Sequence, residues 1–160
     1  MGVGNTLMAD DGFGPAVLEA LEERALPEGT RLLEAGSDPV SMAALVDPGE
    51  ALVLVDAVRM GGAPGEVKVF GPEQASFAVA ASPSSLHGFG LAEALSLLES
   101  VAGPRDITVV GVEPGDLRPG WPMTPAVRAA VAGTADIVLG EAGKIGRSHA
   151  RKTACPPPHP

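Results

Sequence analysis

Two apolar runs constrain this chain more than any other feature of its sequence. Residues 51–55 read Ala-Leu-Val-Leu-Val and lead directly into the charged Asp56, while residues 107–112 read Ile-Thr-Val-Val-Gly-Val. A strand that is apolar on both faces must be covered on both faces, which is the situation of a central strand in a parallel sheet. We therefore expect a sheet with helices packed against each of its faces.

Helical periodicity separates the predicted strands. Phe13, Val17 and Leu21 recur at helical spacing, and this spacing predicts an amphipathic helix. The predicted helices cover residues 12–25, 39–46, 91–101 and 124–141, and shorter strands are expected at 1–4, 31–35 and 66–70. Strands that alternate with helices indicate a three-layer α/β domain, in which ligands bind beyond the carboxyl ends of the strands.

Domain organisation follows from where these patterns stop. The chain has 160 residues without an internal repeat or linker, so a single domain over residues 1–142 accounts for all the predicted elements. Residues 143–160 are basic, rich in Pro and poor in apolar side chains. We expect them to form a disordered tail.

The charge of the chain narrows its partners. Residues 1–142 contain all 20 acidic residues but only 7 of the 11 Lys and Arg, and the net charge of the chain is −9. An acidic surface repels phosphate backbones and anionic lipid, so we expect neither nucleic acid nor a membrane as a partner. No apolar run approaches the roughly 20 residues that cross a bilayer, and the first residues lack a signal-peptide pattern, so we expect a cytoplasmic protein.

Polar residues that could carry chemistry lie where the predicted elements end. Asp11 follows the first strand, Asp56 follows residues 51–55, and His87 precedes a helix. Two carboxylates and an imidazole on one edge suit a borderline divalent ion such as nickel or zinc, and three protein ligands leave coordination positions open. Each residue also has a purely structural interpretation: Asp10 or Asp11 as a helix cap, Asp56 as a turn residue, and His87 as an ordinary loop histidine.

The Gly-rich start suggests a second class of site. Gly2-Val3-Gly4 resembles the opening of a dinucleotide-binding fingerprint, but Leu7 stands where the third glycine belongs. Glu34 could take the place of the ribose-binding carboxylate, so the nicotinamide or flavin interpretation is weakened rather than excluded.

Several segments, in a fixed order, resemble the hydrogenase maturation proteases. Residues 2–14 read GVGNTLMADDGFG and carry the strongest likeness. The match continues with Leu-Val-Asp-Ala at 54–57, with His-Gly-Phe-Gly-Leu at 87–91 after a Ser-Pro segment, and with Val-Val-Gly-Val-Glu-Pro at 109–114. An ordered series of matches, extending from residue 2 to about 142, is more specific than any one Gly-rich loop.

The resemblance implies a fold, an activity and a metal. The fold would be a three-layer α/β/α domain with a mixed, mostly parallel five-stranded sheet, in which residues 66–70 form the antiparallel strand. The activity would be that of an endopeptidase that removes the C-terminal extension from the large-subunit precursor of a nickel-iron hydrogenase. Nickel would arrive in the precursor, and Asp11, Asp56 and His87 would contact it at the catalytic site. We expect the enzyme to be a monomer.

Two questions stay open at the level of the sequence. Nickel could polarise the scissile carbonyl or a water molecule, or Asp11 or Asp56 could serve as a general base. A chaperone that binds nickel or the large subunit without cutting it would carry the same residues.

Two features depart from the resemblance. Only Met1 precedes Gly2, so we expect a truncated first strand. The tail is not part of the match, and no role follows for three of its residues: His149, Cys155 and His159.

Overall fold

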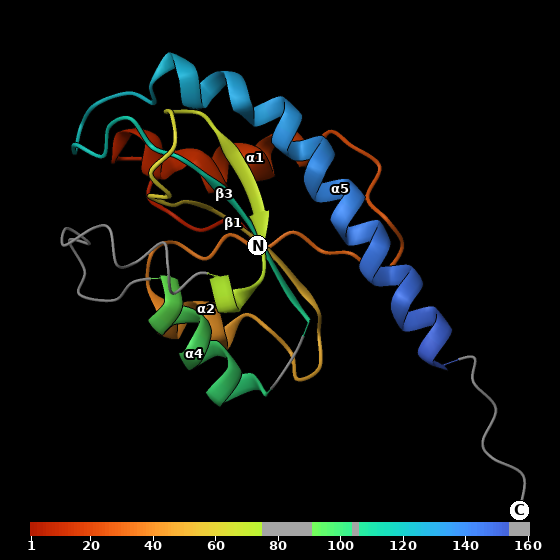
Figure 1. Cartoon of the computed structure of the whole chain (residues 1–160). Helices are drawn as coiled ribbons and strands as arrows, with labels where there is room; N and C mark the ends of the chain where they lie inside the picture. The colour runs from red at the N-terminus through yellow and green to blue at the C-terminus, as the bar shows by residue number, and fades with distance from the viewer. Residues whose placement is uncertain (75–90, 104–105, 154–160) are drawn as a thin grey trace, which may run out of the picture.

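A three-stranded sheet forms the centre of the structure, a computed structural model that describes residues 1–74, 91–103 and 106–153 (Figure 1). Its strands are β1 (Leu52–Ala57), β2 (Val67–Phe70) and β3 (Ile107–Val112), arranged in the order β1-β3-β2. Strands β1 and β3 are parallel, and β2 is antiparallel to β3. The two apolar runs are therefore neighbouring strands, and the predicted antiparallel strand is confirmed.

The first residues of the chain extend this sheet on the far side of β1. Gly2 forms isolated parallel bridges to both Val55 and Glu34. The Val3 N–H donates to the Val55 carbonyl at 2.9 Å, and the Ala35 N–H donates to the Gly2 carbonyl at 3.0 Å. Backbone hydrogen bonds continue on both sides of residues 1–4, from the Val55 N–H to the Met1 carbonyl at 2.8 Å and from the Gly4 N–H to the Gly36 carbonyl at 3.0 Å. The described residues nevertheless contain three regular strands, so the expected five-stranded sheet is not confirmed.

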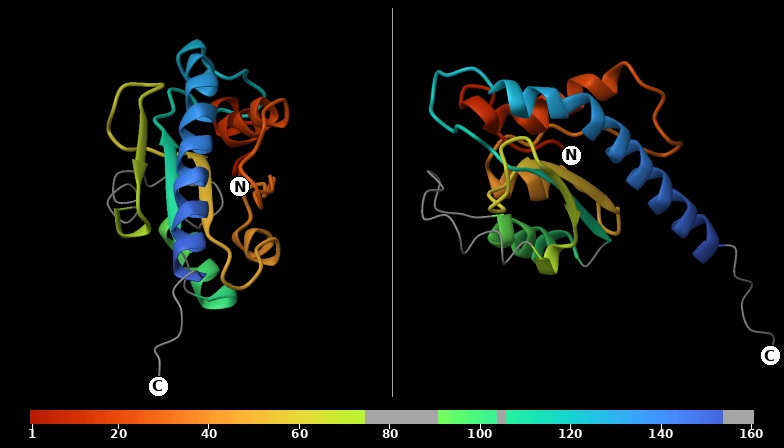
Figure 2. Two further views of the ribbon diagram at one scale, coloured as in Figure 1. Left: turned by 90° about the vertical axis from the view of Figure 1, so that its right-hand side faces the viewer. Right: turned by 45° about the horizontal axis from the view of Figure 1, so that its top comes forward.

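Helices cover both faces of the sheet. They are α1 (Phe13–Glu22), α2 (Pro39–Ala44), α4 (Leu91–Ala102) and α5 (Pro125–Thr153). Helices α1 and α5 pack together on one face, and α2 packs with α4 on the other (Figures 1 and 2). Leu54 belongs to the core on the α2–α4 face, whereas Val55 belongs to the core on the α1–α5 face. The predicted three-layer arrangement follows from this alternation.

The observed helix boundaries correct two expectations. Helix α1 begins at Phe13, after a short 3-10 turn over Ala9–Gly12 that occupies part of the expected loop. Helix α5 continues past Glu141 to Thr153. Its extension lacks proline, and Lys144 bonds to Glu141 at 2.6 Å across one turn, which supports continued helix. No helix in the described ranges is long and apolar enough to cross a membrane.

Close packing explains the glycines near the start of the chain. A side chain on Gly14 would place its Cβ 2.2 Å from the Val3 carbonyl oxygen and 2.7 Å from the Val55 carbonyl oxygen. A Cβ on Gly2 would lie 2.6 Å from the Gly14 oxygen. These contacts let α1 lie directly on the first residues and β1, so the glycines serve helix–strand packing without any need for a phosphate.

Candidate active site

Three segments end at one edge of the sheet and build the candidate site. The first residues run parallel to β1 and lead into the loop over residues 5–12. Asp56 lies near the carboxyl end of β1, and Glu113 follows the carboxyl end of β3. Because parallel strands end at the same edge, their polar terminal residues gather there.

Asp11 and Asp56 form a pair of neighbouring carboxylates. Burial and, to a smaller extent, the negative charge of Asp11 raise the pKa of Asp56 to about 8, and a hydrogen bond from the Ala57 backbone opposes both effects. Two carboxylates that repel each other bind a shared proton or cation more readily than either does alone. The structure therefore brings together two of the three residues that the sequence nominated.

A tight turn fixes the position of the Asp11 carboxylate. The Asn5 N–H donates to Asp11 Oδ2 at 2.7 Å, and the Leu7 N–H donates to the Asn5 side-chain oxygen at 2.9 Å. Gly4 has φ of +129°, and a Cβ there would lie 1.8 Å from the Asp11 carbonyl oxygen. Only glycine fits this backbone, so the residues before Asp11 are shaped around it.

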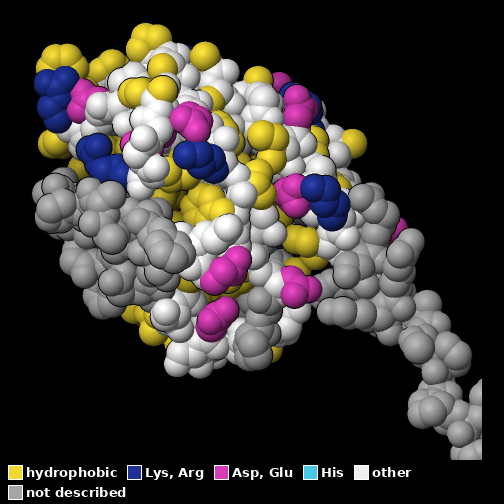
Figure 3. Space-filling view, viewed as in Figure 1, with side chains coloured by type: hydrophobic (Ala, Val, Ile, Leu, Met, Phe, Trp, Pro, Cys, Tyr) yellow, Lys and Arg dark blue, Asp and Glu magenta, His cyan; other side chains and the backbone are white. Residues whose placement is uncertain are grey.

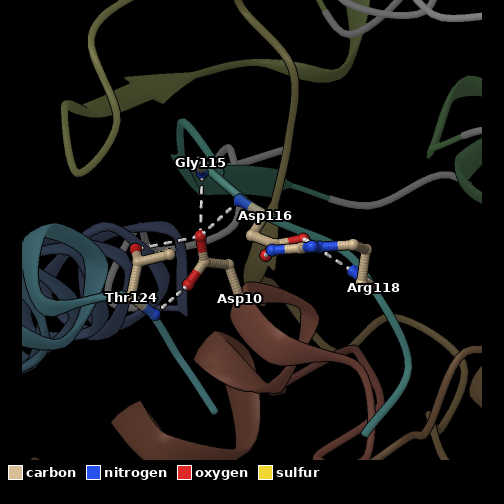
Figure 4. Close-up of polar contacts among 5 residues, drawn as sticks. All are labelled: Asp10, Gly115, Asp116, Arg118 and Thr124. Atoms are coloured by element: carbon tan, nitrogen blue, oxygen red, sulfur yellow. Dashed lines mark hydrogen bonds and ion pairs between the residues drawn. The ribbon is translucent and has the colours of Figure 1, made fainter. Parts of the chain in front are cut away.

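Asp10 has a different role from its neighbour, one that the sequence left open. Its side chain is fully buried and receives hydrogen bonds from the segment that follows β3 (Figure 4). The donors are the N–H of Gly115 at 2.8 Å, the N–H of Asp116 at 2.9 Å, and the N–H and hydroxyl of Thr124 at 2.6 and 3.0 Å. Asp10 thereby ties the loop that carries Asp11 to residues 115–124.

The backbone just before Asp10 is strained. Ala9 has φ of +44° and is the one described residue other than glycine with a positive φ. It is buried, and its N–H donates to the Trp121 carbonyl at 3.1 Å. An alanine in this conformation persists only where its surroundings hold it, and such strain gathers at functional sites. The Asp10 anchor supplies that support.

Glu113 organises the loop that follows β1. Its side chain is buried, and its Oε2 accepts hydrogen bonds from the Met60 N–H at 2.5 Å and the Gly62 N–H at 3.1 Å. Its backbone also joins the start of β2, through the Gly65 N–H and the Glu66 carbonyl. Glu113 therefore shapes the chain just beyond Asp56, and our sequence analysis assigned it no role.

The third nominated residue, His87, lies outside the described residues. Within the described ranges, no group of three or more His, Cys, Asp or Glu side chains could hold a metal ion. The pair formed by Asp11 and Asp56 is thus the described part of the predicted metal site. Of the tail residues without a role, Cys155 and His159 also lie outside the described chain.

A pocket of about 610 Å³ opens beside the same loop. Thr6, Ala9 and Gly12 line it from the loop, and Pro122 and Met123 line it from the segment before α5. The lining also includes three acidic side chains, Glu19 and Glu22 of α1 and Glu34, and one cation, Arg128.

Asp10 and Glu113 are the functional positions that sequence reasoning missed. Both are carboxylates directly after or near a strand end, but each accepts backbone N–H groups far away in the chain. The Asp-Asp pair itself was the available signal for Asp10: two adjacent side chains in a turn point in different directions, so they seldom share one task.

Comparison with known proteins assigns the family. A profile of the hydrogenase maturation protease family matches residues 15–141. The hydrogenase 2 maturation protease of Escherichia coli (strain K12) is 33% identical over 142 residues, which cover 87% of this chain and 86% of that protein. The hydrogenase expression/formation protein HupM of Azotobacter chroococcum mcd 1 is 35% identical, and the match covers 87% of this chain and 68% of that relative.

A solved structure agrees in both sequence and fold. The hydrogenase maturating endopeptidase HybD from E. coli is 31% identical to this chain, with a TM-score of 0.76 and a match that covers 91% of each chain. A [NiFe] hydrogenase maturation protease, HycI from Thermococcus kodakarensis KOD1, is 26% identical with a TM-score of 0.67 and covers 87% of each chain. The chain therefore belongs to the hydrogenase maturation protease family and is a peptide-bond hydrolase.

Proposed function

We propose that this endopeptidase removes the C-terminal extension from the large-subunit precursor of a nickel-iron hydrogenase, after nickel has been inserted into the precursor. The observation that carries the proposal is the close pair of Asp11 and Asp56 at the carboxyl edge of the sheet, in a chain that belongs to this family. The expected five-stranded sheet remains part of this proposal, with its two flanking strands completed around Gly2 and Glu34.

The acid pair suits a divalent ion that arrives with a substrate. Without a cation, burial and the charge of Asp11 raise the pKa of Asp56 to about 8, so its carboxyl group stays protonated below about pH 8. A divalent cation between the two carboxylates would offset their repulsion and allow both to ionise. Nickel is accordingly a part of the substrate, held by the precursor and contacted by Asp11, Asp56 and His87.

Cleavage requires a water molecule to add across one amide bond. The water oxygen attacks the carbonyl carbon, the carbon–nitrogen bond breaks, and the leaving nitrogen takes up a proton. An ionised Asp11 or Asp56 can accept the proton of the attacking water, as an aspartyl-type general base. The nickel of the substrate can orient the scissile bond or polarise its carbonyl.

The proposal also covers where the protein works and in what form. We place it in the cytoplasm as a monomer that acts on the precursor protein, with neither nucleic acid nor a membrane as a partner. The acidic composition of residues 1–142 supports this choice of partner.

The direct test is a gel of precursor incubated with the protein. We expect nickel-loaded precursor to become shorter and nickel-free precursor to remain whole. Stable binding of the nickel-loaded precursor without shortening would instead favour a non-catalytic chaperone and overturn the proposal.

A further inference from the structure

Two exposed apolar residues lie in segments that are hydrogen-bonded to each other beside the candidate site. Leu7 is 73% exposed and Trp121 is 54% exposed. The face of the molecule in Figure 3 displays apolar side chains at several places. The Gly120 N–H donates to the Leu7 carbonyl at 2.8 Å, and the Ala9 N–H donates to the Trp121 carbonyl at 3.1 Å. We call this surface the Leu7–Trp121 patch, and the exposed Pro119 and Pro122 complete it.

Contacts within the segment 116–121 hold the patch in a fixed position. The Arg118 guanidinium lies 4.2 Å from the centre of the Trp121 ring, and Asp116 fixes Arg118 through hydrogen bonds to its guanidinium (Figure 4). Asp116 is held in turn by Asp10, whose carboxylate accepts a hydrogen bond from the Asp116 N–H. A rigid, exposed tryptophan next to a leucine offers apolar contact area with little loss of conformational entropy on binding.

Asn5 links the patch to the acid pair. Leu7 bonds to the Asn5 side chain, and Asn5 bonds to the Asp11 carboxylate. A chain lying across Leu7 therefore passes beside Asp11. The pocket of about 610 Å³ adjoins the patch, because Pro122 and Thr6, the residues next to Trp121 and Leu7 in the chain, line it.

Charge indicates what kind of side chain the pocket accepts. Glu19, Glu22 and Glu34 line it, and Arg128 is the opposing cation. None of these three carboxylates forms an ion pair with a described residue. Carboxylates on one wall attract a cationic side chain and repel an anionic one.

We propose that the Leu7–Trp121 patch and the adjoining pocket bind the precursor segment next to its cleavage site, in an extended conformation. An apolar side chain of that segment lies against Leu7 and Trp121, and a Lys or Arg side chain lies over Glu19 and Glu22. This assignment rests on the proposed function and adds the chemistry by which the enzyme chooses its substrate.

The first test separates binding from chemistry. Leu7→Ser and Trp121→Ser should each raise KM for the nickel-loaded precursor at least tenfold and leave kcat within threefold of wild type. Val40→Ser and Val101→Ser are matched controls, since these side chains are 66% and 64% exposed on the opposite layer of the molecule. An unchanged KM in both patch variants, or an equal rise in the controls, overturns the patch.

A second measurement does not depend on substitution at the patch. Trp121 is the one tryptophan of the chain, so 5-fluorotryptophan labelling gives a single ¹⁹F resonance that the precursor cannot obscure. Nickel-loaded precursor added to labelled Asp56→Asn protein should shift or broaden this resonance once gel filtration confirms a complex. An unmoved resonance in the confirmed complex excludes contact at Trp121.

The charged wall has its own test. Glu19→Gln combined with Glu22→Gln should raise KM at least fivefold at low salt, and the difference from wild type should shrink as salt is added. Glu99→Gln on α4 is the control. A KM that is unchanged at low salt contradicts the basic side chain and leaves only the apolar contact.

The two proposals fail in different ways. If wild-type protein leaves the precursor whole but binds it, and Leu7→Ser or Trp121→Ser weakens that binding tenfold, the proposed function is wrong and the patch stands. If wild-type protein cuts the precursor and both patch variants cut it with unchanged KM, the patch is wrong and the function stands.

Discussion

Asp10 and Asp11 are adjacent in the chain, yet the regions around them use a carboxylate in opposite ways. In the anchor region, Asp10 is surrounded by donors from Gly115, Asp116 and Thr124. In the acid-pair region, Asp11 faces Asp56, and its charge raises the pKa of that residue. One carboxylate is held by donors, whereas the other is opposed by a like charge.

The contrast separates stability from activity. Hydrogen bonds from donors around a buried carboxylate stabilise the fold, because the loss of these bonds leaves backbone N–H groups without partners. Two carboxylates forced together destabilise the fold until a cation or a proton joins them. Substitutions in the anchor region should therefore change the free energy of unfolding, and those in the acid pair should change catalysis.

The acid pair should give the largest effects. Asp56→Asn, His87→Ala and Asp11→Ala should each lower the rate of precursor processing by about 100- to 10,000-fold, the range expected for the loss of an acid–base or metal-contacting group. Asp11→Glu should keep part of the activity, because the longer side chain preserves the carboxylate. Gel assays with nickel-loaded precursor measure the rate, and circular dichroism checks that the fold is intact. Full processing by His87→Ala would remove its metal-sensing role.

The anchor should give the largest loss of stability. Asp10→Ala leaves three backbone N–H groups without their acceptor, and we expect the free energy of unfolding to fall by about 3 kcal/mol or more. Urea unfolding measures the change. The control is Asp38→Ala, since Asp38 also accepts a backbone N–H, that of Ser41 at 2.8 Å, but at an exposed helix start, where about 1 kcal/mol is expected. Equal losses in the two variants would show that Asp10 is an ordinary cap.

The repulsion in the acid pair should be visible as a pH dependence. In the folded protein the pKa of Asp56 is raised to about 8, from an ordinary value of 3.8, so the carboxyl group keeps its proton below about pH 8. Unfolding therefore releases a proton in this window, and wild-type stability should fall as the pH rises from about 4 to 8, by at most about 1.4 kcal/mol per pH unit. Asp56→Asn should lack this fall, so its advantage over wild type grows with pH.

The comparison with Asp56→Asn isolates one group. Burial also lowers the pKa of the Met1 amino group to about 6, and this shift makes stability rise with pH between about 6 and 8. Both proteins share that contribution, so it cancels in the difference between them. Parallel urea-unfolding series at pH 5, 7 and 9 measure the difference in the free energy of unfolding between Asp56→Asn and wild type. A difference that stays constant with pH would mean that Asp56 ionises normally.

The end of the chain should matter least to either region. Removal of residues 147–160 takes away a basic, Pro-rich segment and should change the free energy of unfolding by less than about 0.5 kcal/mol, with processing unaffected. Thermal melts and the gel assay measure both quantities. A clear loss of activity would mean that the basic segment contributes to binding of the precursor.

Periodicity predicted the layers of the fold because buried strands and amphipathic helices impose local patterns on the sequence. The runs ending at Asp56 and Val112 became neighbouring parallel strands, and the helix predicted from residue 39 begins there, with Asp38 as its cap. The sequence could not show that the segments around Gly2 and Glu34 would pair without forming regular strands, since that depends on partners elsewhere in the chain. It also placed the end of α5 too early, because a basic segment with few apolar residues gives no amphipathic signal.

The candidate site was predicted to a different depth. The placement of Asp11 and Asp56 at one edge followed from strand ends, and the structure brings them together. His87 lies outside the described residues, so its place remains a prediction. The roles of Asp10 and Glu113 depend on backbone groups 105 and 53 positions away, and no local pattern encodes such partners.

The long reach of Asp10 also bears on how the enzyme is made. Thr124 lies 114 residues after Asp10, so a growing chain cannot complete this contact until most of the domain has left the ribosome. Until then the strained turn at Ala9, which precedes Asp11, lacks the support of the Asp10 contacts. Contacts that span so much of a chain form late, because the intervening loop must first be closed. A half-made copy of this protease would consequently carry its acidic residues without a working arrangement of them, and cutting would begin only with a nearly finished chain.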